Sequence, residues 1–359
     1  MRRLKQLILK LELDSLILVG NKYDDDAICE FEQDRNFLYL TELDIPNINI
    51  LFIKGKIYCY FSKKVNYPFN NIVKLPKFII ILNKAKYDFL SSQIKNSIID
   101  KHIEYEINKA RTIKDKLEIA KIKRATQYTK KIIEIVNKNI HLCKTEIDLK
   151  NLVLKTNYNL EGYPLSFKPI CSSGQNNKIL HHKAKKQLIK NDSPIILDIG
   201  FRYKNYCSDI TRVLVKKKMK KKAQLLYNNL LNIQKKLISK IKPNISWDDL
   251  ETLYFNELNE VLLEIKILKT RVPNVNILKK FMPHSIGHSI GLDTHDIEID
   301  NILRKKMVIA LEPGIYFSKS LLRLDNKIFN IKVLKFYINN VGGMRIEDII
   351  LVNDVSKIL

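Results

Sequence analysis

Two aspartates stand at the ends of neighbouring apolar runs, where a carboxylate is hard to solvate. Asp198 follows the run Ile195–Leu197, and Asp209 opens the run Ile210–Val215 after a polar turn. These runs predict two strands whose ends carry the carboxylates. Each carboxylate needs an arginine, a set of backbone N–H donors or a metal ion to compensate its charge. Two of them in adjacent runs favour a shared cation.

Three more candidate ligands follow downstream in similar settings. His288 lies in a histidine-rich stretch, Glu312 follows an apolar run and precedes a Pro-Gly turn, and Glu347 opens another apolar run. Any one of these acids is explained equally well as a strand-end carboxylate paired with lysine or arginine. Together, the set of carboxylates with one imidazole is too large for one small site unless that site holds two divalent ions, about 3.5–4 Å apart.

The motifs around these residues resemble a known family, the proline-specific metallopeptidases, which comprise Xaa-Pro aminopeptidase (aminopeptidase P) and Xaa-Pro dipeptidase (prolidase). Each motif alone is weak, but all of them occur in the family's order. The resemblance covers the last two thirds of the chain well and the first third loosely. The motifs that carry it are Leu197-Asp-Ile-Gly200, Asp209-Ile-Thr-Arg212, His284-Ser-Ile-Gly-His288, Glu312-Pro-Gly314 and Arg345-Ile-Glu-Asp348.

The resemblance implies a role for each ligand. Asp198 would bind one metal ion, Asp209 and Glu347 would bridge both, and His288 and Glu312 would complete the second. Oxygen-rich ligation with a single histidine suits hard divalent ions, so manganese fits best and cobalt or zinc could substitute. A hydroxide shared by the two ions would be the nucleophile, and Glu312 could take the proton of the parent water.

The remaining candidate site residues are three histidines and an arginine. By resemblance, His284 would stabilise the tetrahedral oxyanion, while His181 and His295 would line the substrate site and help proton transfer. Arg345 shares a strand face with Glu347 and could orient that carboxylate. The competing interpretations are buried core histidines that serve packing and an arginine at the surface.

Two positions depart from the family's pattern beside the expected pocket. Ser285 stands where the family usually has glycine, and His182 stands where it commonly has tyrosine. A zincin helix would need glutamate after the first histidine of its motif, and Ser285 excludes it. The departures leave the metal set unchanged but affect the expectation for substrate detail.

The fold class implied by the resemblance is α+β. We expect an α/β N-terminal domain over residues 1–110 and a pita-bread catalytic domain of two pseudo-symmetric halves over residues 111–359. The periodicity supports a duplicated order of two helices followed by strands. The expected helices of the catalytic domain are one from Thr112, one capped by Thr145, and a pair over Lys220–Ile241 and Trp247–Leu262.

Composition limits the function classes. The 359 residues carry a net charge of +25, which first suggests nucleic acid. The excess is mostly lysine spread along the whole chain, so we interpret it as compositional drift and expect no nucleic-acid partner. The 5 scattered cysteines without a CxxC pair favour a reduced, cytoplasmic chain. We expect neither a signal peptide nor a membrane span.

The leading hypothesis is a dinuclear metal aminopeptidase that acts on peptides with proline at the second position and forms a dimer or tetramer. A dipeptidase that cleaves only Xaa-Pro is the alternative, and a pita-bread protein that binds a partner without catalysis is a third. Methionine aminopeptidase would leave the first 110 residues unexplained, and creatinase lacks these metal ligands. The sequence does not choose between the two proline peptidases.

Overall fold

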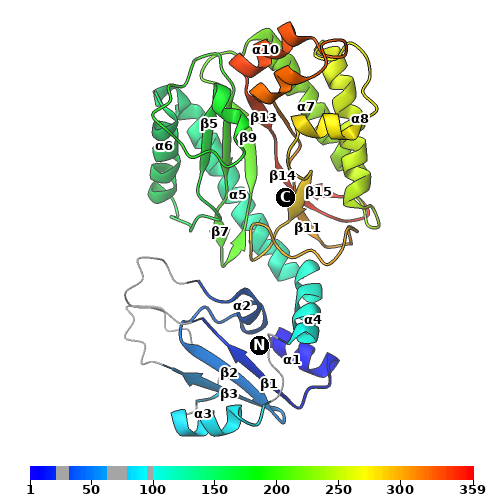
Figure 1. The fold of residues 1–359 in the computed structure, drawn as a ribbon. Coiled ribbons are helices and arrows are strands. Elements are labelled where there is room, and N and C mark those ends of the chain that lie inside the picture. Colours follow the sequence, from blue (N-terminus) through cyan, green and yellow to red (C-terminus); the bar gives the residue numbers. More distant parts are fainter. Residues whose placement is uncertain (22–31, 63–78, 82, 95–99) are drawn as a thin grey trace. The chain divides into compact units, whose positions relative to one another are not determined.

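The computed structural model describes residues 1–21, 32–62, 79–81, 83–94 and 100–359. The chain divides into two compact units, Met1–Arg111 and Thr112–Leu359 (Figure 1). Among the described helices, none combines the length and the apolar character that crossing a membrane requires.

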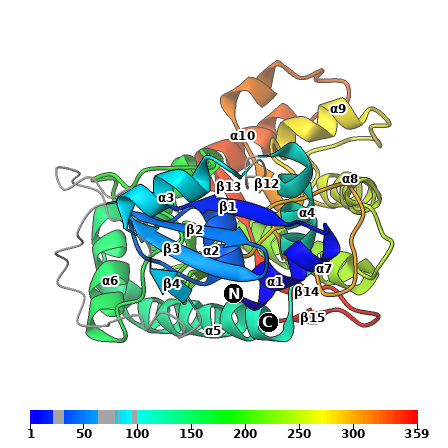
Figure 2. The ribbon, with the colours of Figure 1, turned by 90° about the horizontal axis from the view of Figure 1, so that it is seen from below.

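The N-terminal unit is built on one mixed sheet. In its described part, β1 (Ser15–Val19), β2 (Ile48–Ile53) and β3 (Lys56–Phe61) pair antiparallel and lie side by side, and β4 (Ile79–Ile81) pairs parallel to β3 (Figures 1 and 2). In the sequence, the apolar runs on either side of Lys54-Gly-Lys56 predict a hairpin. That hairpin joins β2 to β3, and Gly55 takes the positive φ of +81° that its turn requires. The helices of this unit are α1 (Arg2–Lys10), α2 (Arg35–Thr41), α3 (Lys84–Ser91) and α4 (Lys101–Thr112).

The sequence also predicts a helix over Tyr87–Lys95 and a strand over Phe78–Leu82 in this unit. The helix expected over Tyr87–Lys95 is α3, which begins earlier because the side chain of Asn83 caps it by accepting from the Lys86 N–H at 2.9 Å. Lys95 lies outside the described residues. The strand expected over Phe78–Leu82 is described only in its middle, and both of its predicted end residues lie outside.

The first half of the larger unit packs two helices on a three-stranded antiparallel sheet. The helices are α5 (Lys116–Asn139) and α6 (Glu146–Asn159), and the sheet has the order β5 (Ile170–Ser173), β6 (Ile195–Ile199) and β9 (Ile210–Leu214). A two-stranded ribbon, β7 (Arg202–Tyr203) and β8 (Tyr206–Cys207), connects β6 to β9. The apolar face of α5 packs on the inner residues of β6 in one core cluster.

Local capping explains where these elements differ from the prediction. The helix expected from Thr112 begins instead at Lys116, because Asp115 and Glu118 form a capping box there. Thr145 caps α6 as predicted. The stretch Ser166–Cys171 predicts a strand, but the observed strand β5 begins only at Ile170.

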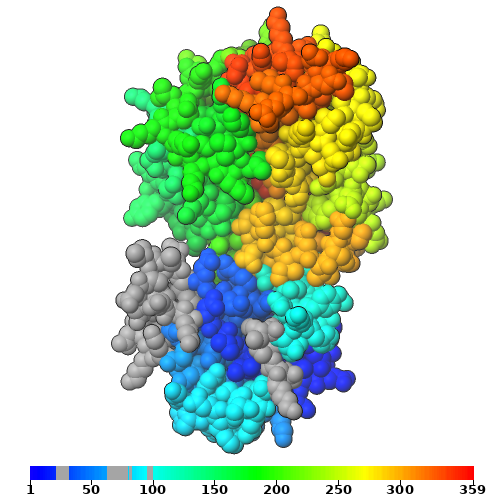
Figure 3. Space-filling view, viewed as in Figure 1, coloured from blue at the N-terminus to red at the C-terminus, as the bar shows by residue number. Residues whose placement is uncertain are grey.

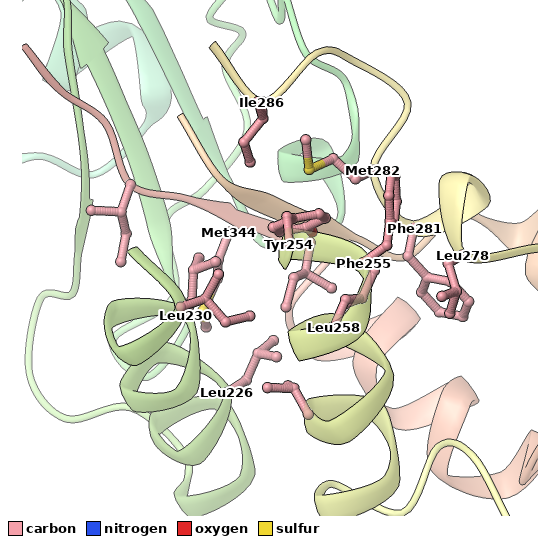
Figure 4. Packing of buried hydrophobic residues seen from close by; sticks show 14 of the residues in the cluster. Leu226, Leu230, Tyr254, Phe255, Leu258, Leu278, Phe281, Met282, Ile286 and Met344 are labelled. Atoms are coloured by element: carbon pink, nitrogen blue, oxygen red, sulfur yellow. The ribbon is translucent and has the colours of Figure 1, made fainter. Parts of the chain in front are cut away.

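The second half repeats the order of two helices followed by strands. Its helices α7 (Lys221–Lys240) and α8 (Trp247–Glu264) follow the predicted ranges within two residues and share a large core with the strands behind them (Figure 4). Its main antiparallel sheet has the order β10 (Gly287–Ser289), β11 (Val308–Leu311), β14 (Asp348–Leu351) and β15 (Lys357–Ile358). A second pair joins β12 (Gly314–Tyr316) to β13 (Gly343–Arg345), and the short α9 (Val275–Leu278) and α10 (Ile331–Asn340) lie outside the sheets.

The two halves lie side by side, green against yellow and orange in Figure 3, and they join through backbone as well as side chains. The Glu347 N–H donates to the Thr211 carbonyl at 3.1 Å, which ties the start of β14 to β9. Next to this bond, Arg212 Nη2 pairs with Asp348 Oδ1 at 2.6 Å. The seam therefore runs directly beside the residues that the sequence marks as metal ligands.

Candidate metal centre and active site

The five predicted ligands lie at strand ends in both halves of the larger unit. Asp198 lies in β6, Asp209 directly precedes β9, and His288 lies in β10. Glu312 directly follows β11, and Glu347 directly precedes β14. All of them line one pocket of about 620 Å³. Residues as far apart in sequence as Asp198 and Glu347 are thus brought to one place by the seam between two sheets.

His288 is at the centre of this cluster. Its Nε2 lies 3.7 Å from Asp209 Oδ2, 3.7 Å from Glu347 Oε1 and 4.0 Å from Glu312 Oε1. Ligand atoms of Asp209, His288 and Glu347 all lie within 4.8 Å of one another. An imidazole surrounded by carboxylate oxygens is a donor set that suits divalent cations.

Two buried oxygen atoms support the same interpretation. Asp198 Oδ1 and Asp209 Oδ1 are shielded from solvent and have no hydrogen-bond partner among the described residues. A buried carboxylate oxygen without a partner is costly. A cation held by these two oxygens would remove that cost, so the residues present fit a metal centre.

The crowding of negative charge perturbs the acids themselves. Burial and the charges of Glu347 and Asp198 raise the pKa of Asp209 well above its ordinary value. Burial and the charge of Glu347 raise the pKa of Glu312 to about 8. Burial also raises the pKa of Asp198, although Arg345 opposes the change. Without cations, the site therefore retains protons that a divalent ion would displace.

The central imidazole of His288 compensates part of this negative charge when it is protonated. Burial lowers the pKa of His288, but its interaction with Glu347 and the charge of Glu312 outweigh burial and raise that pKa to about 9. Burial likewise raises the pKa of Glu347, yet the interaction with His288 brings it below its ordinary value. Protonated His288 and ionised Glu347 therefore form the favoured pair in the metal-free protein.

Arg345 does not contact Glu347 in the way that strand periodicity predicts. Its Nη2 donates to Asp198 Oδ2 at 2.6 Å, its Nη1 to Tyr316 Oη at 2.8 Å and its Nε to Thr211 Oγ1 at 3.2 Å. Thr211 Oγ1 in turn donates to Glu347 Oε2 at 2.8 Å. Arg345 reaches across to the first half because β13 contacts β6 and β9. Its hydrogen bonds reach Glu347 through Thr211, and its charge also helps to lower the pKa of Glu347.

His284 lies beside the cluster with both ring nitrogens engaged. Its Nδ1 lies 2.8 Å from the Ser285 carbonyl oxygen and therefore donates to it. Its Nε2, 2.9 Å from Tyr316 Oη, then accepts from that hydroxyl. Burial and the charge of Arg345 lower the pKa of His284 to about 4, so the ring is neutral. Stabilising an oxyanion as predicted would require His284 to exchange one of these bonds.

The other two predicted histidines lie at the solvent side of the same pocket. The ring of His295 stacks on that of His288 with centroids 3.9 Å apart and planes 8° from parallel. His181 is exposed and lines the pocket wall, as does Ser285. The neighbouring His182 is buried, and its Nε2 lies 2.8 Å from Glu146 Oε2. His182 is thus part of the support of the wall.

Sequence reasoning missed Tyr316 and gave Thr211 no role. Thr211 had a signal, because it alternates with Asp209 along β9 and therefore shares its face. Tyr316 lies two residues beyond Gly314 on β12, where the pairing of Gly314 with Arg345 brings it to the guanidinium. That pairing depends on a strand register that a single sequence does not reveal.

A seam of buried carboxylates around one imidazole, built on a duplicated helix-and-strand unit, is an arrangement that suits a metal-dependent hydrolase. Comparison with known proteins agrees: residues 120–354 match the model of metallopeptidase family M24. The chain belongs to this family. The family and the metallopeptidase class predicted from the motifs are therefore confirmed.

Individual relatives agree with this membership. The chain is 29% identical to an uncharacterized peptidase of Saccharomyces cerevisiae over 93% of its own length and 74% of that protein. It is 29% identical to a protein of Phaeosphaeria nodorum named "Probable Xaa-Pro aminopeptidase", over 94% of its own length and 46% of that protein. Aminopeptidase P of Escherichia coli superposes with a TM-score of 0.80 at 18% identity, covering 99% of this chain and 93% of that one. The predicted pita-bread fold is confirmed by this match.

Proposed function

We propose that this protein is an aminopeptidase that hydrolyses the bond between an N-terminal residue and a following proline, with two divalent ions in the pocket. The observation that carries the proposal is the convergence of both halves' acids on His288 in one pocket. The similarity to relatives named Xaa-Pro aminopeptidase supports the choice of substrate.

We propose Asp198, Asp209, His288, Glu312 and Glu347 as the ligands, with Mn²⁺ as the preferred ion and Co²⁺ or Zn²⁺ as substitutes. Ions held here would supply positive charge that activates a water molecule and polarises the scissile carbonyl group. The bridging roles of Asp209 and Glu347 belong to this proposal.

The protein's own side chains would orient the ligands and the peptide and would transfer protons. Glu312 would take the proton of the nucleophilic water on its carboxylate, whose Oε2 lies 3.7 Å from His284 Nδ1. The planar guanidinium group of Arg345 donates to both the Asp198 carboxylate and the Tyr316 hydroxyl. These bonds limit the rotation of both side chains. His181 and His295, at the wetter side, would contact the peptide.

Hydrolysis of a Xaa-Pro dipeptide and of Xaa-Pro-Xaa tripeptides, with Mn²⁺ present, tests the activity. We expect release of the first residue from the tripeptides, and little release from a matched Xaa-Ala-Xaa peptide. Cleavage of the dipeptide alone would show that the protein is a dipeptidase and not an aminopeptidase. Cleavage of none, in protein shown to hold the metal, would refute the proposal.

Metal analysis of the purified chain is the second test. Mass spectrometry under native conditions should find two divalent ions per chain after loading with Mn²⁺ and none bound tightly by the Asp209→Ala variant. A single ion in the wild-type protein would contradict the dinuclear part and leave the peptidase assignment to the peptide assay.

Three further expectations stay predictions. The first is that residues 1–110 form a separate N-terminal domain beside a catalytic domain of residues 111–359. The second is a dimer or tetramer in solution, which sedimentation analysis would measure. The third is a cytoplasmic location, which fractionation of cells producing the protein would test.

A further inference from the structure

A buried ion pair lies outside the set of metal ligands. Lys114 Nζ is 3.1 Å from Asp296 Oδ2, and the two side chains are only 1% and 2% exposed. Burying a lysine in this way is expensive, and an apolar pair of similar size is often as stable or more so. Stability alone therefore explains this pair poorly, which directs attention to what each partner holds in place.

The cation comes from a rigid part of the larger unit. Lys114 directly precedes Asp115, which caps the 24-residue helix α5. The Lys114 backbone N–H also donates to the Lys306 carbonyl at 3.0 Å, and the Lys306 N–H donates to the Val352 carbonyl at 2.8 Å. The base of the lysine is thus tied to a long helix on one side and to the end of the β14 region on the other.

The anion belongs to the loop that leaves β10. The Asp296 N–H donates to the Ser289 carbonyl at 2.9 Å, which closes the loop on the strand. Within the loop, the Gly291 carbonyl accepts from the Cys207 N–H at 2.8 Å. A Cβ on Gly291 would lie 2.0 Å from Asp296 Oδ2 and 3.1 Å from Lys114 Cε, so the ion pair occupies the space that a larger residue would need.

The residue before Asp296 is His295, whose ring stacks on the central histidine of the metal cluster at 3.9 Å. A stack with planes 8° apart depends on the backbone that carries the outer ring. His295 is exposed, so solvent on its outer side does not fix the orientation of the ring. Both neighbours of His295 anchor this backbone: Thr294 Oγ1 donates to the Ser166 carbonyl at 3.3 Å, and the N–H of buried Asp296 donates to Ser289.

We propose that Lys114, through Asp296, is a positioning residue for the reaction: it holds the Gly291–Asp296 loop so that His295 stays stacked on His288 at the mouth of the pocket. This inference rests on the proposed function for its effect on turnover. Its structural part, the stack, is independent of which peptide the enzyme cleaves. A ring displaced by about 1 Å can reduce turnover about a hundredfold.

The kinetic test compares Lys114→Met, Asp296→Asn and His295→Ala with the double variant Lys114→Met/His295→Ala. Each single substitution should lower kcat about 10- to 100-fold while KM changes about threefold or less, as for other supporting residues. The double variant should be no slower than His295→Ala, since the lysine acts through that ring. Multiplying effects in the double variant, or full kcat in both charge variants, would overturn the proposal.

The structural test uses metal-free protein and does not depend on activity. The chain has 7 histidines, so side-chain nitrogen–proton NMR spectra can be assigned by single substitutions. In the wild-type protein the His288 and His295 ring protons should show mutual ring-current shifts. Asp296→Asn should remove these shifts, and their persistence in that variant would refute the clamp even if no peptide is cleaved by any form.

Two controls separate positioning from general stability. Lys236→Met removes an exposed lysine that pairs with Glu257 on the outer helices, and it should leave kcat and the ring shifts unchanged. Leu258→Ala truncates a fully buried side chain of α8 and should lower the melting temperature without changing kcat at 25 °C. Should Lys114→Met fail to fold, the nearly isosteric Asp296→Asn decides both tests.

Discussion

The two halves of the larger unit share a plan but differ in charge. Each places two helices before an antiparallel sheet and puts candidate ligands at strand ends. The first half contributes Asp198 and Asp209, both buried. The second contributes acids as well, but also His288 and Arg345. His288 Nε2 lies 3.7 Å from Asp209 Oδ2, and Arg345 Nη2 lies 2.6 Å from Asp198 Oδ2. The first half's anions are thus compensated across the seam.

This difference indicates that the site stabilises the seam between the halves only when the buried carboxylates are compensated by positive charge. Burying an acid without a partner costs more than any single hydrogen bond returns. The halves are therefore coupled through the pocket, and metal ions would strengthen that coupling because they bind both sides at once. Removing charges from one side at a time tests the comparison.

Asp209→Ala should have the largest effect. It removes from the first half an acid within reach of His288, so catalytic efficiency should fall about a thousandfold or more. Circular dichroism should show an intact fold, because loss of a crowded anion relieves repulsion. The matched control is Asp192→Ala, which removes a half-exposed aspartate of the same half and should retain full activity. Full activity in Asp209→Ala would contradict its role as a ligand.

Arg345→Met breaks the compensation from the other side. Asp198 then stays buried without its cation, and the metal-free protein should lose about 3–5 kcal/mol of unfolding free energy. Urea denaturation measures the loss. With Mn²⁺ bound the loss should shrink, since the ions replace the guanidinium charge. Arg304→Met, which breaks an exposed pair with Asp300, should change stability by less than about 1 kcal/mol. Equal losses in both variants would refute the charge argument.

The pH dependence of the metal-free protein should reveal the same imbalance. With its pKa raised to about 8, Glu312 stabilises the fold below its ordinary pKa of 4.5, and this contribution is lost as pH rises to 8. His288, raised to about 9, contributes fully below 6.5 and loses its contribution through pH 9. Both act in one direction, so stability should fall between pH 6 and pH 8.

Thermal unfolding in the presence of a chelator measures this fall. The melting temperature should drop by at least about 3 °C between those pH values. Mn²⁺ should reduce the drop by replacing the protons, and Glu312→Gln should reduce it without any metal. A melting temperature that rises with pH in the chelated wild-type protein would show that the acids of the two halves are not crowded as described.

Thr211→Val should have the smallest effect. It keeps the shape of the side chain but removes the hydroxyl that accepts from Arg345 and donates to Glu347. We expect catalytic efficiency to fall about tenfold, as for other residues that orient a ligand. Thr252→Val, on the exposed side of α8, is the control and should be silent. A loss as large as that of Asp209→Ala would mean that Thr211 does more than orient Glu347.

Much of the local structure could be predicted from the sequence. The runs around Asp198 and Asp209 form β6 and β9 because short apolar runs bounded by turn residues favour strands through local sequence alone. The helix α7 follows its predicted range for the same local reason. The onset of α5 was misplaced because the capping box of Asp115 was not recognised.

Partners across the seam could not be predicted in this way. Arg345 was assigned to Glu347, its neighbour in sequence, whereas its ion pair is with Asp198. The pair of Lys114 with Asp296 was not anticipated at all. Both depend on how two sheets and one loop dock, and a single sequence carries no signal of that docking.

By itself, the sequence determined which atoms are available for a metal and that each lies at the end of an apolar run, because strand periodicity acts over a few residues. Only the tertiary structure decided which cation compensates which carboxylate. That choice depends on long-range closure of the chain, and at this seam a shift of one residue in strand pairing would turn Arg345 away from Asp198.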